Sequence, residues 1–253
     1  MANNQWKHVW ITGASSGLGE HVARQLADQG IHVSITARSK DKLQAIVDSS
    51  PNISAYPADV TNAESLRDLV GRIELAHGPI DMCIFSAGAW FPGKITDLQV
   101  ENFAKTIDVN LMGVVNALDA VMGPMLARGQ GHISWVSSVA GYGGLPNSAA
   151  YGSSKAALIH MAESVRPELE RKGLTVSVIN PGFVKTPMTS QNDFPMPFLM
   201  EPEDAATKMI EGLQAKKFEI AFPWQLVWIL KILNLLPYSA YHFLIRKFVL
   251  GGR

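Results

Sequence analysis

Short apolar segments alternate along the chain with longer segments in which apolar residues recur at helical spacing. The apolar segments, typical of buried strands, are His8–Thr12, His32–Ala37, Ile53–Pro57, Met82–Ser86, Gly131–Ser137, Leu174–Asn180 and Phe218–Phe222. The helical segments are Leu18–Gln29, Lys40–Asp48, Ala63–His77, Val100–Arg128, Ser153–Lys172 and Glu203–Ala215. This alternation predicts an α/β fold with a doubly wound parallel sheet of about seven strands and helices on both faces. Ligands bind such sheets at the carboxyl ends of the strands.

Composition favours a single domain and excludes several classes of function. The chain has 253 residues, 47% of them hydrophobic, and we find no repeat or linker, so we expect one domain over 1–222 with 223–253 as its helical extension. Its 22 basic and 22 acidic side chains leave no net field to recruit nucleic acid. The single cysteine, Cys83, permits no disulfide framework and is expected to be a buried structural thiol. We expect no metal cluster, no secretory signal and a reducing, cytoplasmic location.

A glycine-rich segment, Thr12-Gly-Ala-Ser-Ser-Gly-Leu-Gly19, joins the first strand to the first helix. Its glycines allow a tight turn and close backbone approach, and the following helix N-terminus offers N–H groups and a positive dipole end to a phosphate. The pattern favours a dinucleotide pyrophosphate as the ligand, although an ordinary strand–helix connection is the alternative for such a turn by itself. The residues expected to hold it are Gly13, Ser15, Ser16, Gly17, Leu18 and Gly19.

Ser138, Tyr151 and Lys155 bring a hydroxyl, a phenol and an ammonium into one short stretch of sequence. Tyr151 and Lys155 are four residues apart and therefore share a helix face. A phenol with a pKa of about 10 is a poor acid or base at neutral pH, and a nearby cation favours its ionised form. The pair by itself could be a helix-face contact without chemistry, but in combination with the glycine-rich turn it favours proton transfer.

These two features, in this order, resemble the short-chain dehydrogenase/reductase family, in its single-domain, tyrosine-dependent branch, over residues 7–222. Further matching segments are Asp59-Val60, Ala87-Gly88, Asn110 in Val-Asn-Leu-Met-Gly, Ser138 in Ser-Ser-Val-Ala-Gly and Pro181-Gly-Phe-Val-Lys-Thr186. The resemblance implies a Rossmann-like fold, an NAD(P)-dependent oxidoreductase acting on carbonyls or secondary alcohols, and a homodimer or homotetramer. The family's Asn-Asn-Ala-Gly segment here reads Phe85-Ser-Ala-Gly88, which puts its usual amide bridging in doubt.

The resemblance also implies a role for each matching residue. Tyr151 exchanges a proton with the substrate oxygen during hydride transfer, Ser138 orients that oxygen, and Lys155 contacts the cofactor ribose and keeps Tyr151 acidic. Asn110 holds a water on the proton path, with plain packing as the alternative. The other implied cofactor contacts are Asp59, Val60, Ser86, Ala87, Gly88, Pro181, Gly182, Val184 and Thr186, together with Tyr151 and Lys155.

The end of the second strand favours NADP(H) over NAD(H). An acidic residue there would bind the 2′-hydroxyl of NAD, whereas this chain has Ala37 and Arg38. A guanidinium suits a 2′-phosphate, and a merely solvated Arg38 is the alternative. Ser16 occupies a position that is basic in many NADP-preferring relatives, which weighs against NADP.

Apolar residues after the fourth, fifth and sixth strands favour a lipophilic small-molecule substrate and a loop that closes over it. Those expected around the pocket, some of them only packing, are Trp90, Phe91, Tyr142, Leu145, Phe183, Met188, Phe194, Met196, Phe198 and Met200.

The tail, residues 223–253, is apolar and basic. Its first stretch is too short for a confident membrane span, Pro237 interrupts it, and no acidic residue follows Glu219. The tail is expected to form a lid or a subunit interface, with contact to a membrane surface as the alternative. Three classes of function therefore stay open: an NADP-dependent oxidoreductase, which is favoured, a non-catalytic NADP-binding sensor, and a membrane-surface protein.

Overall fold

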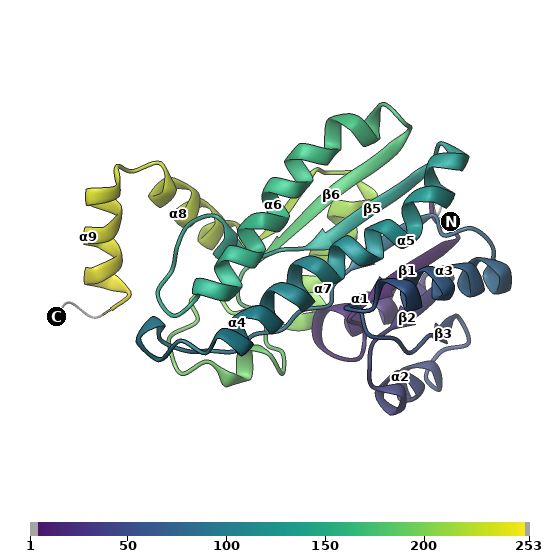
Figure 1. The fold of residues 1–253 in the computed structure, drawn as a ribbon, viewed down its shortest axis with the longest axis horizontal. Helices are drawn as coiled ribbons and strands as arrows, with labels where there is room; N and C mark the ends of the chain where they lie inside the picture. Colours follow the sequence, from purple (N-terminus) through teal and green to yellow (C-terminus); the bar gives the residue numbers. More distant parts are fainter. Residues whose placement is uncertain (1–4, 251–253) are drawn as a thin grey trace.

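The computed structural model describes residues 5–250 and contains one seven-stranded parallel sheet (Figure 1). The strands are β1 (His8–Thr12), β2 (His32–Thr36), β3 (Ile53–Ala55), β4 (Met82–Phe85), β5 (Gly131–Val136), β6 (Leu174–Pro181) and β7 (Glu219–Phe222). Their order across the sheet is β3-β2-β1-β4-β5-β6-β7. The order reverses between β1 and β4, and ligands bind parallel sheets at such a switch point. The predicted fold class and all seven predicted strands are confirmed, with only their ends shifted.

Helices cover both faces of the sheet. They are α1 (Gly17–Asp28), α2 (Lys40–Val47), α3 (Ala63–His77), α4 (Val100–Ile107), α5 (Gly113–Arg128), α6 (Ala149–Glu170), α7 (Pro202–Gln214), α8 (Trp224–Asn234) and α9 (Tyr238–Phe248). The helix expected over Val100–Arg128 is confirmed as one continuous helical run, and a π-helical turn within it, Asp108–Met112, lies between α4 and α5. Such wide turns place a side chain off the regular helical register, and they are frequent at functional sites.

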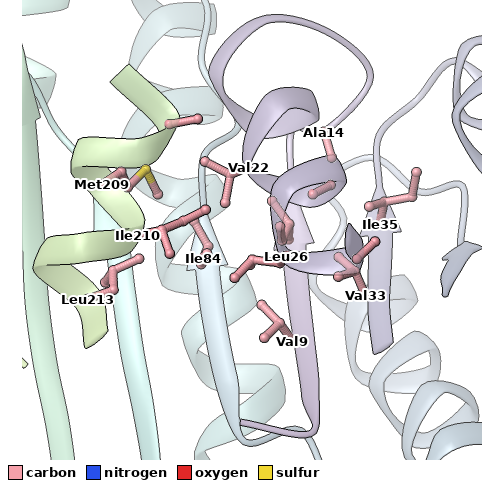
Figure 2. Packing of buried hydrophobic residues seen from close by; sticks show 14 of the residues in the cluster. Val9, Ala14, Val22, Leu26, Val33, Ile35, Ile84, Met209, Ile210 and Leu213 are labelled. Carbon is pink, nitrogen blue, oxygen red and sulfur yellow. The ribbon is translucent and has the colours of Figure 1, made fainter. Parts of the chain in front are cut away.

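The apolar core lies in two layers, one on each face of the sheet. On one face, Val22 and Leu26 of α1 and Ile210 of α7 pack over Val9 of β1 and Ile84 of β4 (Figure 2). On the other face, α3, α5 and α6 cover a layer that contains the largest buried side chains, Trp10, Trp135 and Phe85. Strands buried on both faces are apolar along their whole length, which is why the sequence shows continuous apolar runs here.

The run Val100–Arg128 is the one helical run among the described residues that is long and apolar enough to cross a membrane. Its buried residues, among them Val114, Ala117 and Met125, belong to the core layer shared with α3 and α6. Val100–Arg128 thus packs as a core helix that covers the sheet. Such core helices can be as long and as apolar as a membrane-spanning helix.

Four histidines lie at the amino edge of the sheet. The ring nitrogens of His8 lie 2.9 Å from the Ser34 hydroxyl and 2.9 Å from the Gly78 carbonyl. The rings of His32 and His77 stack with centroids 3.9 Å apart, and His132 Nε2 lies 2.8 Å from the Ser177 hydroxyl. Burial lowers the pKa of His8, and it lowers the pKa values of His32 and His132 to about 4. The imidazoles of His8, His32 and His132 are therefore neutral at pH 7 and act as packing groups.

Candidate active site

The glycine-rich turn lies at the carboxyl edge of the sheet, between β1 and α1. Gly13 has φ +71°, and a Cβ atom on it would lie 2.4 Å from the Ala87 backbone nitrogen. Gly17 has φ +60°, and a Cβ atom on Gly19 would lie 2.7 Å from the Gly13 carbonyl oxygen. Side chains are excluded at these positions by backbone conformation and by space. The turn therefore exposes bare backbone and the N-terminus of α1, where the Ser16 side chain makes no capping bond.

Ser138, Tyr151 and Lys155 converge at the same edge. Ser138 stands two residues after the end of β5; its hydroxyl donates to the Pro181 carbonyl at 3.3 Å and also hydrogen-bonds the Tyr151 side chain. Tyr151 lies in the first turn of α6 and Lys155 one turn later, with Lys155 Nζ 5.5 Å from the Tyr151 ring centroid. Lys155 Nζ also donates to the Val136 carbonyl at 2.8 Å. The helix register predicted from the four-residue spacing brings the phenol and the ammonium together.

Burial dominates the titration of both groups. It raises the pKa of Tyr151, and the hydrogen bond from Ser138 opposes this only in part. It also lowers the pKa of Lys155 to about 7. The expectation that Lys155 keeps Tyr151 acidic stays a prediction, because burial removes from each side chain the water that would stabilise its charged form. Anionic phosphates bound in the same site would favour the protonated form of Lys155.

Asn110 lies in the π-helical turn and is fully buried. Its Nδ2 donates to the Ala89 carbonyl at 3.1 Å and to the Ser154 hydroxyl at 3.0 Å, while its Oδ1 accepts from the Ala89 amide at 2.6 Å. Asn110 therefore clamps the loop after β4 to α6, two residues from the cavity lining at Asp108. Its predicted role in holding a water stays a prediction. At Phe85, where the family carries an amide, the ring packs edge to face against Trp10 instead.

A cavity of about 810 Å³ runs along this edge and joins the two groups of residues. Every residue that we expected to contact a cofactor lines it, as do Ser138, Tyr151 and Lys155; Asn110 lies behind the lining. The predicted lining residues are Gly13, Ser15, Ser16, Gly17, Leu18, Gly19, Arg38, Asp59, Val60, Ser86, Ala87, Gly88, Pro181, Gly182, Val184 and Thr186.

The cavity has further lining residues that the sequence reasoning missed. Lys42 and Ser39 lie next to Arg38 at the start of α2, and Lys105 and Asp108 come from the α4 side. Lys42 could have been found, because it stands four residues after Arg38 at the beginning of an expected helix. No spacing in the sequence indicated Lys105 and Asp108, because their distance from the cavity depends on how α4 packs against the rest of the protein.

Few of the expected substrate-pocket residues face the cavity. Phe91 and Met188 line it, and the Trp90 ring packs edge to face on Tyr151 with centroids 5.3 Å apart. The loop after β6 folds back on itself, because the amide of Met200 donates to the Phe183 carbonyl at 3.0 Å. Asn192 of this loop nevertheless accepts a hydrogen bond from the Trp90 ring nitrogen at 3.2 Å, so the loop lies against the residue that packs on Tyr151, while Phe198 is exposed. The others pack elsewhere: Phe194 against Phe183, Met196 at Asn192, and Met200 against the core.

Tyr142 does not face the cavity either, but belongs to a polar cluster behind it. Glu219 of β7 accepts hydrogen bonds from Tyr142 at 2.6 Å, from Asn180 at 3.0 Å and from Lys231 of α8. Burial raises the pKa of Glu219, but these donors outweigh it and the pKa lies below its usual value. Burial and Glu219 raise the pKa of Tyr142. The cluster ties α8 to the loop that begins at Ser138.

The comparisons with known proteins identify the protein family to which this chain is similar. A family model described as "short chain dehydrogenase" matches residues 7–195. An uncharacterized oxidoreductase of Myxococcus xanthus is 37% identical over 241 residues, covering 94% of this chain and 95% of its own length. An uncharacterized oxidoreductase of Staphylococcus epidermidis is 35% identical over 214 residues, covering 84% and 93%.

Solved structures share the fold. "ElxO with NADP Bound" superposes with a TM-score of 0.77 at 27% identity, covering 86% of this chain and 98% of its own. An actinorhodin polyketide ketoreductase variant with NADPH has a TM-score of 0.77 at 26% identity, covering 87% and 96%. A short-chain dehydrogenase from Streptomyces avermitilis has a TM-score of 0.83 and covers 98% and 99%, at 22% identity.

Proposed function

Because this chain belongs to the short-chain dehydrogenase family, we propose that it is an NADP(H)-dependent oxidoreductase that interconverts a lipophilic carbonyl compound and the corresponding secondary alcohol. The observation that carries the proposal is the meeting of Ser138, Tyr151 and Lys155 with the bare glycine turn in one cavity. The turn, with no room for a Cβ atom, fits the pyrophosphate of a dinucleotide. When bound, the nicotinamide supplies or accepts the hydride.

The side chains of the site supply proton transfer, orientation of the substrate oxygen and electrostatic support. Tyr151 is the general acid in the reducing direction and the general base in the oxidising one, since its side chain hydrogen-bonds Ser138 and lines the cavity. Ser138 orients the substrate oxygen by a hydrogen bond that strengthens as negative charge develops on it. Lys155 carries positive charge beside Tyr151 and lowers the cost of an ionised phenol once the site holds anionic phosphates. Asn110 keeps the loop and α6 in register.

The preference for NADP(H) rests on the cations at the end of β2. Arg38, Ser39 and Lys42 line the cavity beside Ala37, so two positive charges and one hydroxyl are available to a 2′-phosphate. Two acidic residues, Asp59 and Asp108, also line the cavity; Asp59 stands after β3, where its carboxylate accepts hydrogen bonds from Thr61. Two similar proteins were solved with NADP or NADPH, which agrees with this preference.

The proposed substrate class rests on the apolar groups around Tyr151. Trp90 covers the phenol ring, while Phe91 and Met188 line the adjoining part of the cavity. Such a lining favours a substrate that buries apolar surface, and it offers a sugar few hydrogen-bond partners. A homodimer or homotetramer and a cytoplasmic location stay predictions.

The test is cofactor oxidation with purified protein, NADPH or NADH, and ketones and aldehydes graded from polar to long-chain. We expect turnover that is faster with NADPH and that rises with chain length. Equal use of NADH would overturn the cofactor preference, and preference for polar carbonyls would overturn the substrate class. Tight cofactor binding without turnover on any carbonyl would instead favour the sensor alternative.

A further inference from the structure

The helices α8 and α9 form an extension at one end of the molecule, with α9 beyond the ends of the other helices (Figure 1). The extension is anchored to the body. Leu226 and Val227 of α8 are buried against Val139, and the Tyr241 hydroxyl of α9 donates to the Gly144 carbonyl at 2.7 Å. Lys231 adds its ion pair with Glu219. The inner face of the extension therefore packs on the body, whereas the described part of the chain leaves its outer face uncovered.

That outer face of α8 is an apolar stripe. Trp224, Trp228, Ile232 and Leu235 follow one another at helical spacing, and they are 68%, 60%, 56% and 84% exposed. Tyr238, Phe243 and Phe248 of α9 are also exposed, but their five-residue spacing places them on different sides of that helix. We call Trp224, Trp228, Ile232 and Leu235 the apolar stripe. Contiguous apolar surface of this kind marks a docking site rather than ordinary surface variation.

The charged residues that the extension itself contributes are all basic. No residue after Glu219 is acidic, and Glu219 itself is neutralised by Lys231. Arg246 and Lys247 are exposed at the end of α9, and Lys247 Nζ lies 5.4 Å from the Phe248 ring centroid. Arg253 adds a further positive charge to the sequence but lies outside the described residues. The surface is thus apolar, aromatic and basic.

We propose that the apolar stripe, with Arg246 and Lys247, docks the protein onto an anionic lipid surface. Trp and Tyr side chains favour the boundary between lipid headgroups and acyl chains, where an amphipathic helix lies flat with its apolar face down. Lysine and arginine beside that face bind anionic headgroups. A second copy of this chain is disfavoured as the occupant, because its own extension carries no acidic residue to pair with these cations.

The docked orientation has a consequence for the proposed function, on which this last step rests. The inner face of α8 packs on Val139, next to Ser138, and α9 holds Gly144 in the same loop. The surface that contacts lipid is therefore the outer side of the wall behind the reacting groups. A lipophilic substrate dissolved in the bilayer is then concentrated close to the site.

The experiment is co-sedimentation of the full chain with vesicles of phosphatidylcholine alone or with phosphatidylglycerol, without substrate. We expect binding to the mixed vesicles, weakened about 30-fold by Arg246→Gln with Lys247→Gln, at about 1 kcal/mol per basic residue near the surface. Arg171→Gln with Lys172→Gln, an exposed pair at the end of α6, is the matched control and should not weaken it. Trp224→Ser with Trp228→Ser should abolish binding to both vesicles, whereas Leu75→Ser on the 89% exposed Leu75 of α3 should not.

Retained NADPH binding shows that each variant is folded. Failure of the wild type to sediment, or equal losses in the control variants, would overturn the proposal. So would a wild-type oligomer, measured by light scattering, that Trp224→Ser with Trp228→Ser converts to monomer, because the stripe would then join two copies. Turnover of a water-soluble ketone without vesicles is measured separately, so failure of docking is distinguishable from failure of the proposed reaction.

Discussion

The two edges of the sheet both bury titratable side chains, but they use them differently. At the amino edge, His8 and His132 lie within hydrogen-bond distance of serine hydroxyls of neighbouring strands, and neither lines the cavity described above. At the carboxyl edge, Tyr151 and Lys155 have similarly shifted pKa values but face an open cavity. A shifted pKa therefore does not by itself mark an active site, since burial produces it at either edge. The cavity distinguishes them.

The sharpest way to break this comparison is to remove the phenolic oxygen at the carboxyl edge. Tyr151→Phe deletes the proposed general acid/base while leaving the ring under Trp90, so the rate of NADPH-dependent carbonyl reduction should fall by about 10²- to 10⁴-fold. NADPH affinity, measured by fluorescence titration, should stay close to that of the wild type. Equal turnover in the variant would remove Tyr151 from the mechanism.

Lys155→Met should lower the rate of carbonyl reduction and raise the free energy of unfolding at pH 7. Burial holds the pKa of Lys155 at about 7 instead of 10.5, a difference that corresponds to roughly 5 kcal/mol. Because the folded pKa is the lower one, the unfolded chain binds the extra proton, and the folded wild type loses stability as pH falls from 10.5 towards 7. Without bound cofactor, the variant should therefore unfold at higher urea concentration than the wild type at pH 7, and its advantage should shrink as pH rises. A less stable variant across this range would contradict the buried-cation argument.

His132→Gln tests the amino edge. The pKa of His132 is about 4 in the folded protein and about 6.5 when unfolded, so the wild type should lose about 3 kcal/mol of stability as pH falls from 6.5 to 4. His32 and His8 contribute in the same direction. Urea unfolding at several pH values should show a shallower acid loss for the variant, with turnover unchanged at pH 7.5. An unaltered pH dependence would mean that His132 is not the group being titrated.

The smallest expected effect concerns cofactor choice, at the solvent-exposed end of the carboxyl edge. Arg38→Ala with Lys42→Ala should weaken NADPH binding by roughly 10- to 100-fold, as charge-assisted hydrogen bonds to a 2′-phosphate are lost, and should leave NADH binding unchanged. Titration with both cofactors measures the ratio. The matched control is Arg171→Ala with Lys172→Ala, which should alter neither affinity.

Residues whose position depends on local sequence were predictable. The glycine turn, the strands and the one-turn separation of Tyr151 and Lys155 each follow from spacing of a few residues, and the structure has them where the sequence placed them. Residues positioned by packing over long sequence separations were not. The loop after β6 was expected to cover the site, which stays a prediction; the contacts that shape the loop, Phe183 with Met200 and Trp90 with Asn192, join residues far apart in the sequence. The π-helical turn at Asn110 also had no local signal in a segment that reads as one helix.

The Glu219 cluster lies between two parts of the molecule: the residues that line the cavity, and the C-terminal helices α8 and α9. The described groups of the dinucleotide cavity all precede β7, whereas the wall behind the loop after Ser138 is held by Glu219 and the helices that follow it. Exchanging the segment after Phe222, together with its contact at Tyr142, would alter this wall while replacing none of the residues that line the cavity, although Gly182 packs against Pro223 and Leu226. Gene segments encoding this C-terminal wall are therefore the natural place to diversify, by evolution or in a library, when a new substrate is sought.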